Sequence, residues 1–389
     1  MKILYLSMAF NKQGDNLYNN LVDSLLNRGH LVTIVKSNTQ EEFIDVISNN
    51  YKILNVKTGN TFEANLIKKG INQIRLQSYF KKAIKRKLKE DHFDLILYAT
   101  PPITLYGVIK YCKEKYKATT FLMLKDIFPQ NAVDLNMFSK KSFLYKYFRN
   151  QEKKYYEISD FIGCMSQGNI DYLLKHNPEI RKDKVNIFYN SIKVNCDLNT
   201  EFNTDKTVFI FGGNLGKPQN IPFLLEVIKK LSDYPKAYFK IIGKGTEQTI
   251  INKFKNKYLL NNLQYIEYLP SNEYEEILKK ADVGLISLDE RFTIPNIPSK
   301  FQFYLRQKKP VLAITDTNTD IKDMILNSNC GWWIEAHDDE KVINLIKSIC
   351  EKKEDQINKG KNGFKYFINE FDVEKNVDII EKFYGEKIK

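Results

Sequence analysis

The chain has 389 residues, of which 43% are hydrophobic and 13% aromatic, and its formal net charge is +13 at pH 7. This composition excludes a globally disordered chain, and the length exceeds what one compact core usually holds, so we expect two domains. No apolar run approaches the roughly 20 residues of a transmembrane helix, and scattered cysteines without a CxxC pair are typical of reduced thiols in a cytosolic protein.

Strand-like and helix-like segments alternate along the first half of the chain. KILYLSM predicts a first strand rather than a signal peptide, NLYNNLVDSLLNRGH predicts a helix ending near Gly29, and LVTIVK predicts a second strand. FDLILYA, TTFLML and DFIGCMS repeat the pattern, each followed by a helical segment. The apolar runs are short and continuous, as in parallel strands covered on both faces. We therefore predict a doubly wound, Rossmann-like α/β domain over residues 1–195.

The pattern restarts after the polar stretch VNCDLNTEFNTDKT, where TVFIFGG, AYFKIIG, VGLIS and PVLAI are the next strand candidates. We predict a second Rossmann-like domain over residues 196–371; one large sheet with an insertion is the alternative. Residues 372–389 form an amphipathic helix that we expect to pack back on the first domain. Ligands of such sheets bind beyond the carboxyl ends of strands, where strand order reverses, so two facing domains would form a cleft.

The strand-to-helix loop in FIFGGNLGKPQNI is the sharpest local signal. Glycines allow close approach to the backbone, a helix beginning near Pro218 would favour an anion, and Lys217 adds a positive charge. Neither GxGxxG with a following acidic residue nor GxxxxGK[ST] is present, so phosphate binding and a plain turn both stay open. KIIGKGTEQTI repeats the arrangement, and the candidate residues of the two loops are Gly213, Asn214, Lys217, Gly243, Gly245, Thr246 and Glu247.

The third loop of this kind lies in IPNIPSKFQFYLRQKKPVLAI. Pro298 precedes a short helix, Ser299 is expected to cap its free N–H groups, and Lys300 places a positive charge beside them. Three such loops after strands of one domain together indicate a site for a nucleotide diphosphate.

Candidates in the first domain are fewer, and we expect Gly14, Asp15 and Thr100 to lie on the acceptor side. The loop after the first strand contains Gly14 and Asp15, and Thr100 precedes two prolines after another strand. Lys125 and Asp126 end the strand TTFLML, where a carboxylate would take or orient a hydroxyl proton, or would only cap a loop or helix. The four histidines match no metal spacing, so we expect no metal site and no cofactor.

The segment KKGINQIRLQSYFKKAIKRKLKE has no acidic residue before Glu90 and apolar residues at i, i+4 spacing. One face is apolar and the other cationic, which suits an anionic membrane surface. The alternative is a helix that covers the sheet with a lysine-rich solvated side. The candidate membrane-facing residues are Arg75, Tyr79, Phe80, Lys81, Lys82, Lys85 and Arg86.

GGNLGKPQNI, IPSKFQFYLRQKKPVLAI, LKDIFPQNAVDL and NRGHLVTIV together resemble retaining nucleotide-sugar glycosyltransferases of family 4, which have the GT-B fold. The resemblance covers nearly the whole chain, keeps the order of the motifs, and is nearest to enzymes that build bacterial surface polysaccharides. It implies that the loop ending at Lys217 holds the donor diphosphate, that Pro298, Ser299 and Lys300 lie along the donor, and that Gly243–Glu247 lies near the base.

The sequence departs from the family pattern at several positions. Asn214 stands where the family often has an arginine, and Thr100 where many relatives have a histidine. The family often has two glutamates, the first of which contacts the donor sugar and the second the ribose hydroxyls. Their positions hold Pro295 and Phe303 in this sequence. Side chains that would replace these carboxylates are Gln302, Glu290 and Arg291, and we expect Gln302 to bind the donor.

The resemblance and the loops predict a metal-independent retaining glycosyltransferase at the inner face of the cell membrane. Its donor would be a nucleoside-diphosphate sugar, with uridine as the expected nucleoside, and its acceptor a glycan or polyprenyl-diphosphate-linked glycan. The expected catalytic residues are Asp126, Lys217 and Lys300. A nucleotide-sugar epimerase of the same fold and a non-catalytic partner subunit are the alternatives. Nucleic acid is not expected, because no helix-turn-helix, zinc-finger or RNP1 signature accompanies the charge.

Overall fold

A computed structural model describes residues 1–12, 14–58, 66–194 and 205–388 of the chain. The protein divides into two compact units, the first comprising Met1–Tyr189 with Val373–Lys389 and the second Asn190–Asp372. The division lies at Tyr189, whereas the sequence placed it after residue 195. Each unit is an α/β domain built on a mainly parallel sheet, as the sequence predicted.

The first unit has an eight-stranded sheet in the order β3-β4-β2-β1-β5-β6-β7-β8. All neighbouring strands are parallel except β3, which pairs antiparallel with β4. Strand order reverses between β1 and β5, so the loops after these strands border the expected ligand position. The strands are β1 (Lys2–Leu6), β2 (Leu31–Asn38), β3 (Phe43–Ser48), β4 (Tyr51–Lys57), β5 (Leu95–Ala99), β6 (Thr119–Leu124), β7 (Phe161–Cys164) and β8 (Val185–Ile187).

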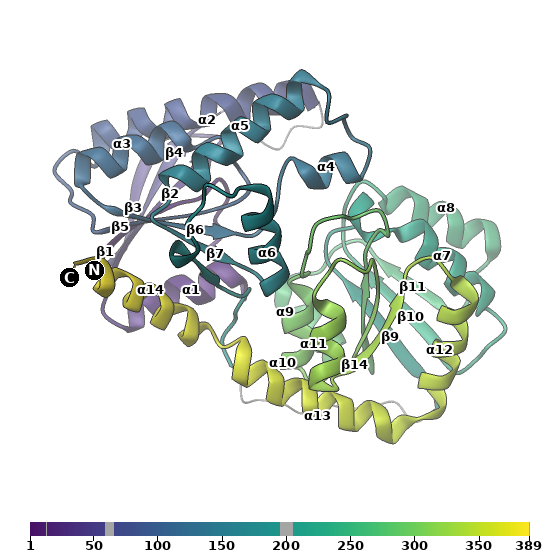
Figure 1. Ribbon diagram of the computed structural model, residues 1–389. Helices are drawn as coiled ribbons and strands as arrows, with labels where there is room; N and C mark the ends of the chain where they lie inside the picture. The colour runs from purple at the N-terminus through teal and green to yellow at the C-terminus, as the bar shows by residue number, and fades with distance from the viewer. Residues whose placement is uncertain (13, 59–65, 195–204, 389) are drawn as a thin grey trace. The chain divides into compact units, whose positions relative to one another are not determined.

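Helices cover this sheet, and α3 contacts both α2 and α5 so that the three form one layer (Figure 1). The last helix, α14, packs beside α1 and buries Val377 and Ile380 in the core of the first unit. Arg28 anchors α14 through ion pairs to Asp378 at 2.6 Å and Glu381 at 3.0 Å. The helices are α1 (Leu17–Asn27), α2 (Leu66–Lys87), α3 (Tyr106–Tyr116), α4 (Gln130–Asp134), α5 (Phe143–Ile158), α6 (Gln167–His176), η1 (Lys182–Lys184) and α14 (Val373–Ile388).

The apolar face of α2 packs inside the protein. Leu76, Phe80 and Ile84 are each 0% exposed, and α2 contacts α3 and β4. The prediction that Phe80 faces a membrane is therefore wrong, because this stripe covers the sheet. The solvated side keeps its basic residues, including Lys82 and Lys85. Among the described residues, no helix combines the length and apolar character needed to cross a bilayer.

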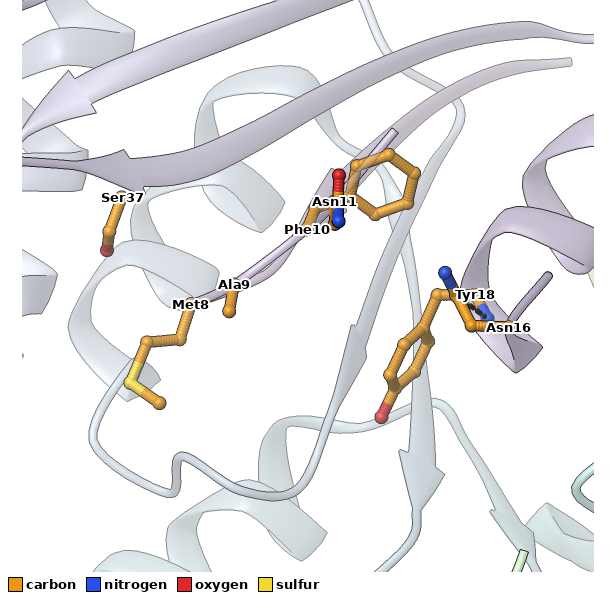
Figure 2. A pocket seen from close by; sticks show the side chains of 7 residues that line it. All are labelled: Met8, Ala9, Phe10, Asn11, Asn16, Tyr18 and Ser37. Atoms are coloured by element: carbon orange, nitrogen blue, oxygen red, sulfur yellow. Dashed lines mark hydrogen bonds between the residues drawn. The ribbon is translucent and has the colours of Figure 1, made fainter. Parts of the chain in front are cut away.

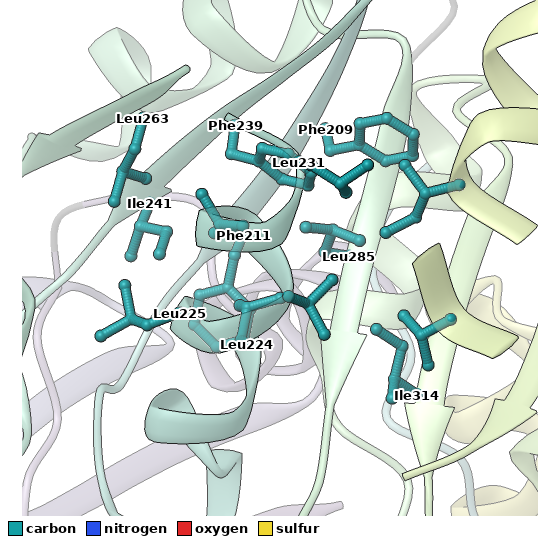
Figure 3. Packing of buried hydrophobic residues seen from close by; sticks show 14 of the residues in the cluster. Phe209, Phe211, Leu224, Leu225, Leu231, Phe239, Ile241, Leu263, Leu285 and Ile314 are labelled. Carbon is teal, nitrogen blue, oxygen red and sulfur yellow. The ribbon is translucent and has the colours of Figure 1, made fainter. Parts of the chain in front are cut away.

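The second unit has a six-stranded parallel sheet in the order β11-β10-β9-β12-β13-β14, which reverses between β9 and β12. Its core is aromatic and aliphatic, with Phe209 of β9 stacked on Phe239 of β10 at a ring-centroid distance of 5.3 Å (Figure 3). The strands are β9 (Thr207–Gly212), β10 (Ala237–Ile242), β11 (Leu263–Ile266), β12 (Val283–Ser287), β13 (Val311–Thr315) and β14 (Gly331–Glu335). The helices are η2 (Lys217–Gln219), α7 (Ile221–Lys230), α8 (Gln248–Tyr258), α9 (Ser271–Lys279), α10 (Lys300–Arg306), α11 (Ile321–Ser328), α12 (Asp339–Glu351) and α13 (Lys353–Glu370).

Tyr304 fixes the short helix α10 beneath the strands where this sheet reverses. Its buried hydroxyl accepts the N–H of Gly212 at 3.2 Å and lies within donating distance of the Ile210 carbonyl at 3.1 Å and the Leu285 carbonyl at 3.2 Å. A Cβ on Gly284 would lie 2.3 Å from the Tyr304 ring, so the glycine leaves room for it. The hydroxyl thus ties α10 to both β9 and β12.

We expect Tyr304→Phe to lower the free energy of unfolding by about 1–3 kcal/mol, because buried backbone groups lose their partner. Urea unfolding followed by circular dichroism measures this loss. The matched control is Tyr258→Phe on α8, whose residue is 37% exposed and should leave the urea midpoint unchanged. Equal stability of Tyr304→Phe and the wild-type protein would contradict this role.

Candidate functional site

The loops that follow β9 and β10 touch through their backbones. A Cβ on Gly243 would lie 1.8 Å from the Gly213 carbonyl oxygen, and one on Gly245 would lie 2.3 Å from the Leu215 carbonyl oxygen. Only glycine fits these two positions, because no side chain can displace a backbone so close. The N–H of Leu215 also donates to the Lys244 carbonyl at 2.8 Å. The two loops, which the sequence predicted as separate candidates, therefore form one surface at the carboxyl ends of these strands.

Hydrogen bonds within the protein already occupy the amides of the glycines themselves. The N–H of Gly213 donates to the Ile242 carbonyl at 2.9 Å, and that of Gly243 to the Ile266 carbonyl at 3.0 Å. The N–H of Gly245 donates to the side chain of Gln248 at 3.2 Å. In the part of the chain that the structure describes, the intervening amides of Asn214, Lys244 and Thr246 have no acceptor. The glycines thus bring the backbones together, and their neighbours supply the open donors.

Lys300 joins the third loop to the first. Its Nζ lies 3.5 Å from the centroid of the Phe211 ring, and its Cε lies 3.9 Å from the position that a Cβ on Gly213 would take. Burial lowers the pKa of Lys300 to about 7. No ion pair joins it to a carboxylate in the described part of the chain. A half-buried cation without a counter-ion, next to a loop with an open amide, is suited to an anionic ligand.

The start of α10 differs from the prediction in two respects. Ser299 occupies the N-cap position with helical dihedral angles, but its side chain makes no capping hydrogen bond, so the hydroxyl is not the predicted cap. Gln302 is 0% exposed, which contradicts its assignment as a donor ligand. Pro298 is half-buried directly before the helix, and Lys217 is exposed at the start of η2.

The positions of the missing family glutamates are apolar in the structure. Pro295 is buried, and Phe303 is half-buried with the guanidinium carbon of Arg306 5.1 Å from its ring centroid. Of the proposed substitutes, Arg291 is paired with Asp289 at 2.6 Å, whereas Glu290 is exposed. These observations assign no carboxylate to the role of either glutamate.

The first unit has a pocket of about 380 Å³ beyond the end of β1 (Figure 2). Tyr18 of α1 lies across the pocket from the segment Met8–Asn11, as the close-up shows. Gly14 and Asp15 belong to the same loop but do not line the pocket; they accept hydrogen bonds from Asn19 at 2.8 Å and Asn20 at 2.6 Å instead. The lining residues are Met8, Ala9, Phe10, Asn11, Asn16, Tyr18 and Ser37, of which the sequence had singled out none.

Asp126 follows β6 and is half-buried close to Tyr18. Burial raises the pKa of Asp126 to about 6, although a hydrogen bond from the Asn131 side chain at 2.8 Å favours its ionised form. The pKa of Tyr18 is raised first by burial and then by the charge of Asp126. Burial also lowers the pKa of the neighbouring Lys125 to about 7. The pKa of this carboxylate is therefore closer to neutral pH than that of an ordinary aspartate.

Thr100 organises this turn rather than contacting an acceptor. It is 2% exposed, and its hydroxyl donates to the Asp126 carbonyl at 3.1 Å while accepting the N–H groups of Lys125 at 3.0 Å and Asp126 at 3.2 Å. The prediction of a direct acceptor contact is wrong for this residue, because its hydrogen-bonding capacity is used within the protein.

The sequence is similar to a known protein family and to a curated protein. Residues 198–366 match the family described as Glycosyl transferases group 1. The probable glycosyltransferase WbjE of Pseudomonas aeruginosa is 25% identical over 297 residues, which are 74% of this chain and 73% of that protein.

Two solved structures share the fold of this chain. Sucrose-phosphate synthase from Thermosynechococcus elongatus has a TM-score of 0.80 at 14% identity, covering 100% of this chain and 99% of that one. HepE of Anabaena in complex with UDP-glucose has a TM-score of 0.69 at 13% identity, covering 99% and 100%. The chain therefore has the GT-B fold, and its residues 198–366 are similar to glycosyl transferases group 1.

Proposed function

We propose that the protein is a retaining glycosyltransferase of family 4 that uses a nucleoside-diphosphate sugar, with UDP as the nucleotide. The observation that carries this proposal is the convergence of the loops after β9 and β10 with Lys300, next to the strand-order reversal of the second unit. The match of residues 198–366 to glycosyl transferases group 1 supports it, and so does the likeness of fold to HepE, which was solved with UDP-glucose.

The proposed reaction is attack by an acceptor hydroxyl on the anomeric carbon as the nucleoside diphosphate leaves. Lys300, Lys217 and the open amides of Asn214 and Thr246 would stabilise the negative charge that develops on the diphosphate oxygens. Asp126, whose pKa is raised to about 6 by burial, would orient or accept the proton of the acceptor hydroxyl. With no covalent enzyme nucleophile, retention requires that the hydroxyl attack on the same face of the sugar from which the diphosphate departs. The product then keeps the anomeric configuration of the donor.

We assign the acceptor to the class of glycans or polyprenyl-diphosphate-linked glycans of bacterial surface polysaccharides, at the cytoplasmic face of the membrane. The pocket at Phe10, Asn11 and Tyr18 supports this class, because it combines apolar and hydrogen-bonding side chains as sugar recognition requires. The exposed basic side of α2, with Lys82, Lys85 and Arg86, supports an anionic membrane surface as a further partner.

A thermal-shift panel of nucleotide sugars tests the donor, because a ligand that binds the folded state raises the melting temperature by mass action. UDP-sugars should give the largest shift. Product analysis without acceptor separates transfer from epimerisation, since an epimerase alone would convert the donor to its epimer. The anomeric configuration of the transferred sugar, determined by NMR, tests retention. No stabilisation by any nucleotide sugar would favour a non-catalytic subunit.

Metal independence is part of the proposal and has its own test. Among the described residues, no group of three or more His, Cys, Asp or Glu side chains is placed to hold a metal ion. Activity of the purified protein should be the same with excess EDTA as without it. Loss of sugar transfer in the presence of EDTA, and its recovery when a divalent cation is added, would contradict metal independence.

We expect Lys217→Ala to lower turnover more than tenfold, which corresponds to roughly 1.4 kcal/mol or more of transition-state stabilisation, with little change in melting temperature. Lys217 is exposed, so its removal leaves no cavity. The matched control is Lys361→Ala on α13, which is also exposed and should keep full turnover. Unchanged kinetics of Lys217→Ala would remove this residue from the site.

A further inference from the structure

The segment between α4 and the first turn of α5 exposes large apolar side chains. Met137, Phe143 and Leu144 are 57%, 83% and 47% exposed. Phe143 is the most exposed of the large hydrophobic side chains among the described residues. We define the docking patch as Met137, Lys140, Lys141, Phe143 and Leu144.

The exposure of this patch is a property of an ordered turn. Phe138 and Phe148 pack edge-on against Phe128, with ring centroids 6.2 and 5.0 Å away, and hold the segment to the body of the unit. Ser142 caps α5 by accepting the Tyr145 N–H at 3.1 Å, and its hydroxyl donates to the Ser139 carbonyl at 2.7 Å. Inward-facing aromatics and a capped helix therefore leave Phe143 and Leu144 pointing away from the core.

The charged residues along the segment of the patch are all basic. Lys140, Lys141 and Lys146 are exposed, and no acidic residue occurs between Asp134 and Glu152. The basic side of α2 belongs to the same layer of helices, because α3 contacts both α2 and α5 (Figure 1). Apolar side chains surrounded by cations thus project from a layer that is itself basic.

We propose that the docking patch inserts into an anionic lipid bilayer, with Phe143 and Leu144 in the interfacial region and Lys140 and Lys141 among the headgroups. This inference deepens the membrane partner of the proposed function and moves the apolar contact from α2, whose apolar stripe is buried, to the start of α5. A stable protein–protein interface buries roughly 1,200–2,000 Å² in total, far more than three side chains supply. Insertion of a few side chains aided by lysines is instead typical of reversible membrane binding.

Flotation of the full-length protein with phosphatidylcholine vesicles, with or without phosphatidylglycerol, tests the proposal. The wild-type protein should bind the vesicles that contain phosphatidylglycerol and not the neutral ones, with weaker binding at high salt. The double variant Phe143→Ser with Leu144→Ser should bind roughly tenfold more weakly or worse. The matched control is Val46→Ser with Leu326→Ser, whose side chains are 70% and 54% exposed elsewhere and whose loss should change nothing.

A second variant tests the charges independently. Lys140→Gln with Lys141→Gln should weaken binding and reduce its dependence on salt. Each variant should keep the wild-type melting temperature and the thermal shift with a UDP-sugar, so that a failed membrane proposal is distinguishable from a failed donor site. Wild-type affinity of the Phe143→Ser, Leu144→Ser variant, or equal binding of the wild-type protein to neutral vesicles, would overturn the proposal.

Discussion

Gly243→Ala is expected to destabilise the second unit by about 2–4 kcal/mol and to abolish binding of a nucleotide sugar. The new methyl group would lie 1.8 Å from the Gly213 carbonyl oxygen, far inside van der Waals contact, and the residue has a φ of +154° that side chains rarely adopt. The loops after β9 and β10 would have to separate, which displaces the open amides of Asn214 and Thr246. Urea unfolding and a thermal-shift titration with UDP-glucose measure the two effects.

The control for this variant is Gly385→Ala in α14. A Cβ at Gly385 meets nothing within 4 Å, and the residue lies within a helix. The substitution should leave nucleotide-sugar binding unchanged and raise stability by up to about 1 kcal/mol, because alanine has the higher helix propensity. If Gly243→Ala bound the nucleotide sugar as the wild-type protein does, the contact between the two loops would not be needed for the site.

The sequence predicted the central strands of both sheets well because these strands are buried on both faces. β5 and β9 are entirely buried, so each is a short continuous apolar run, as expected for a parallel strand that is covered on both faces. The edge strands were missed for the opposite reason, and β4 was missed although it lies inside the first sheet. β3 is only partly buried, β8 has three residues, and β14 carries two half-buried tryptophans, so none shows a clear period.

Amphipathic periodicity alone did not reveal what the apolar stripe of α2 contacts. A stripe containing Leu76, Phe80 and Ile84 suits a bilayer surface and a sheet equally well, and only the fold shows that it covers the sheet. The exposure of Phe143 could not be predicted from the sequence, because a single aromatic residue near the start of a helix is common.

The candidate site was predictable where a loop and its chemistry are local in sequence. A glycine after each strand predicted the close approach of the backbones at Gly213 and Gly243. The sequence did not predict which amides remain open, because the acceptors that occupy the glycine amides, such as the Ile266 carbonyl, come from distant parts of the chain. Tyr18 was missed because it occupies an ordinary helical position. Its pKa is raised by burial and then by the charge of Asp126, which is distant in sequence.

Lys300→Met is expected to weaken the binding of a nucleotide sugar roughly a hundredfold, since hydrogen bonds to a charged group contribute about 1.5–3 kcal/mol. The same substitution should stabilise the ligand-free protein at pH 7. The reason is that burial lowers the pKa of Lys300 to about 7 from its usual 10.5, so a charged ammonium in this position costs free energy until an anion arrives. A residue with a purely structural role would lose stability on replacement.

The pH dependence of this effect has a definite sign. The unfolded chain keeps a proton on Lys300 up to about pH 10.5 and the folded protein only up to about pH 7, so the unfolded state binds more protons in this window. The stability of the wild-type protein relative to Lys300→Met should therefore rise as pH increases from 7 towards 10.5. Affinity for UDP-glucose should fall roughly tenfold per pH unit above 7, because binding requires the protonated lysine.

Lys125 provides a matched control in the other unit. Burial lowers the pKa of Lys125 to about 7 as well, and its Nζ donates to the Tyr189 carbonyl at 3.3 Å. Lys125→Met should remove a similar pH-dependent contribution to stability while leaving UDP-glucose affinity and its pH profile unchanged. Calorimetric titration of both variants between pH 6 and pH 9 therefore separates a half-buried lysine that binds the donor from a half-buried lysine that does not. An unaltered pH profile in Lys300→Met would exclude Lys300 as the titrating group, because that profile would then have to arise from another residue.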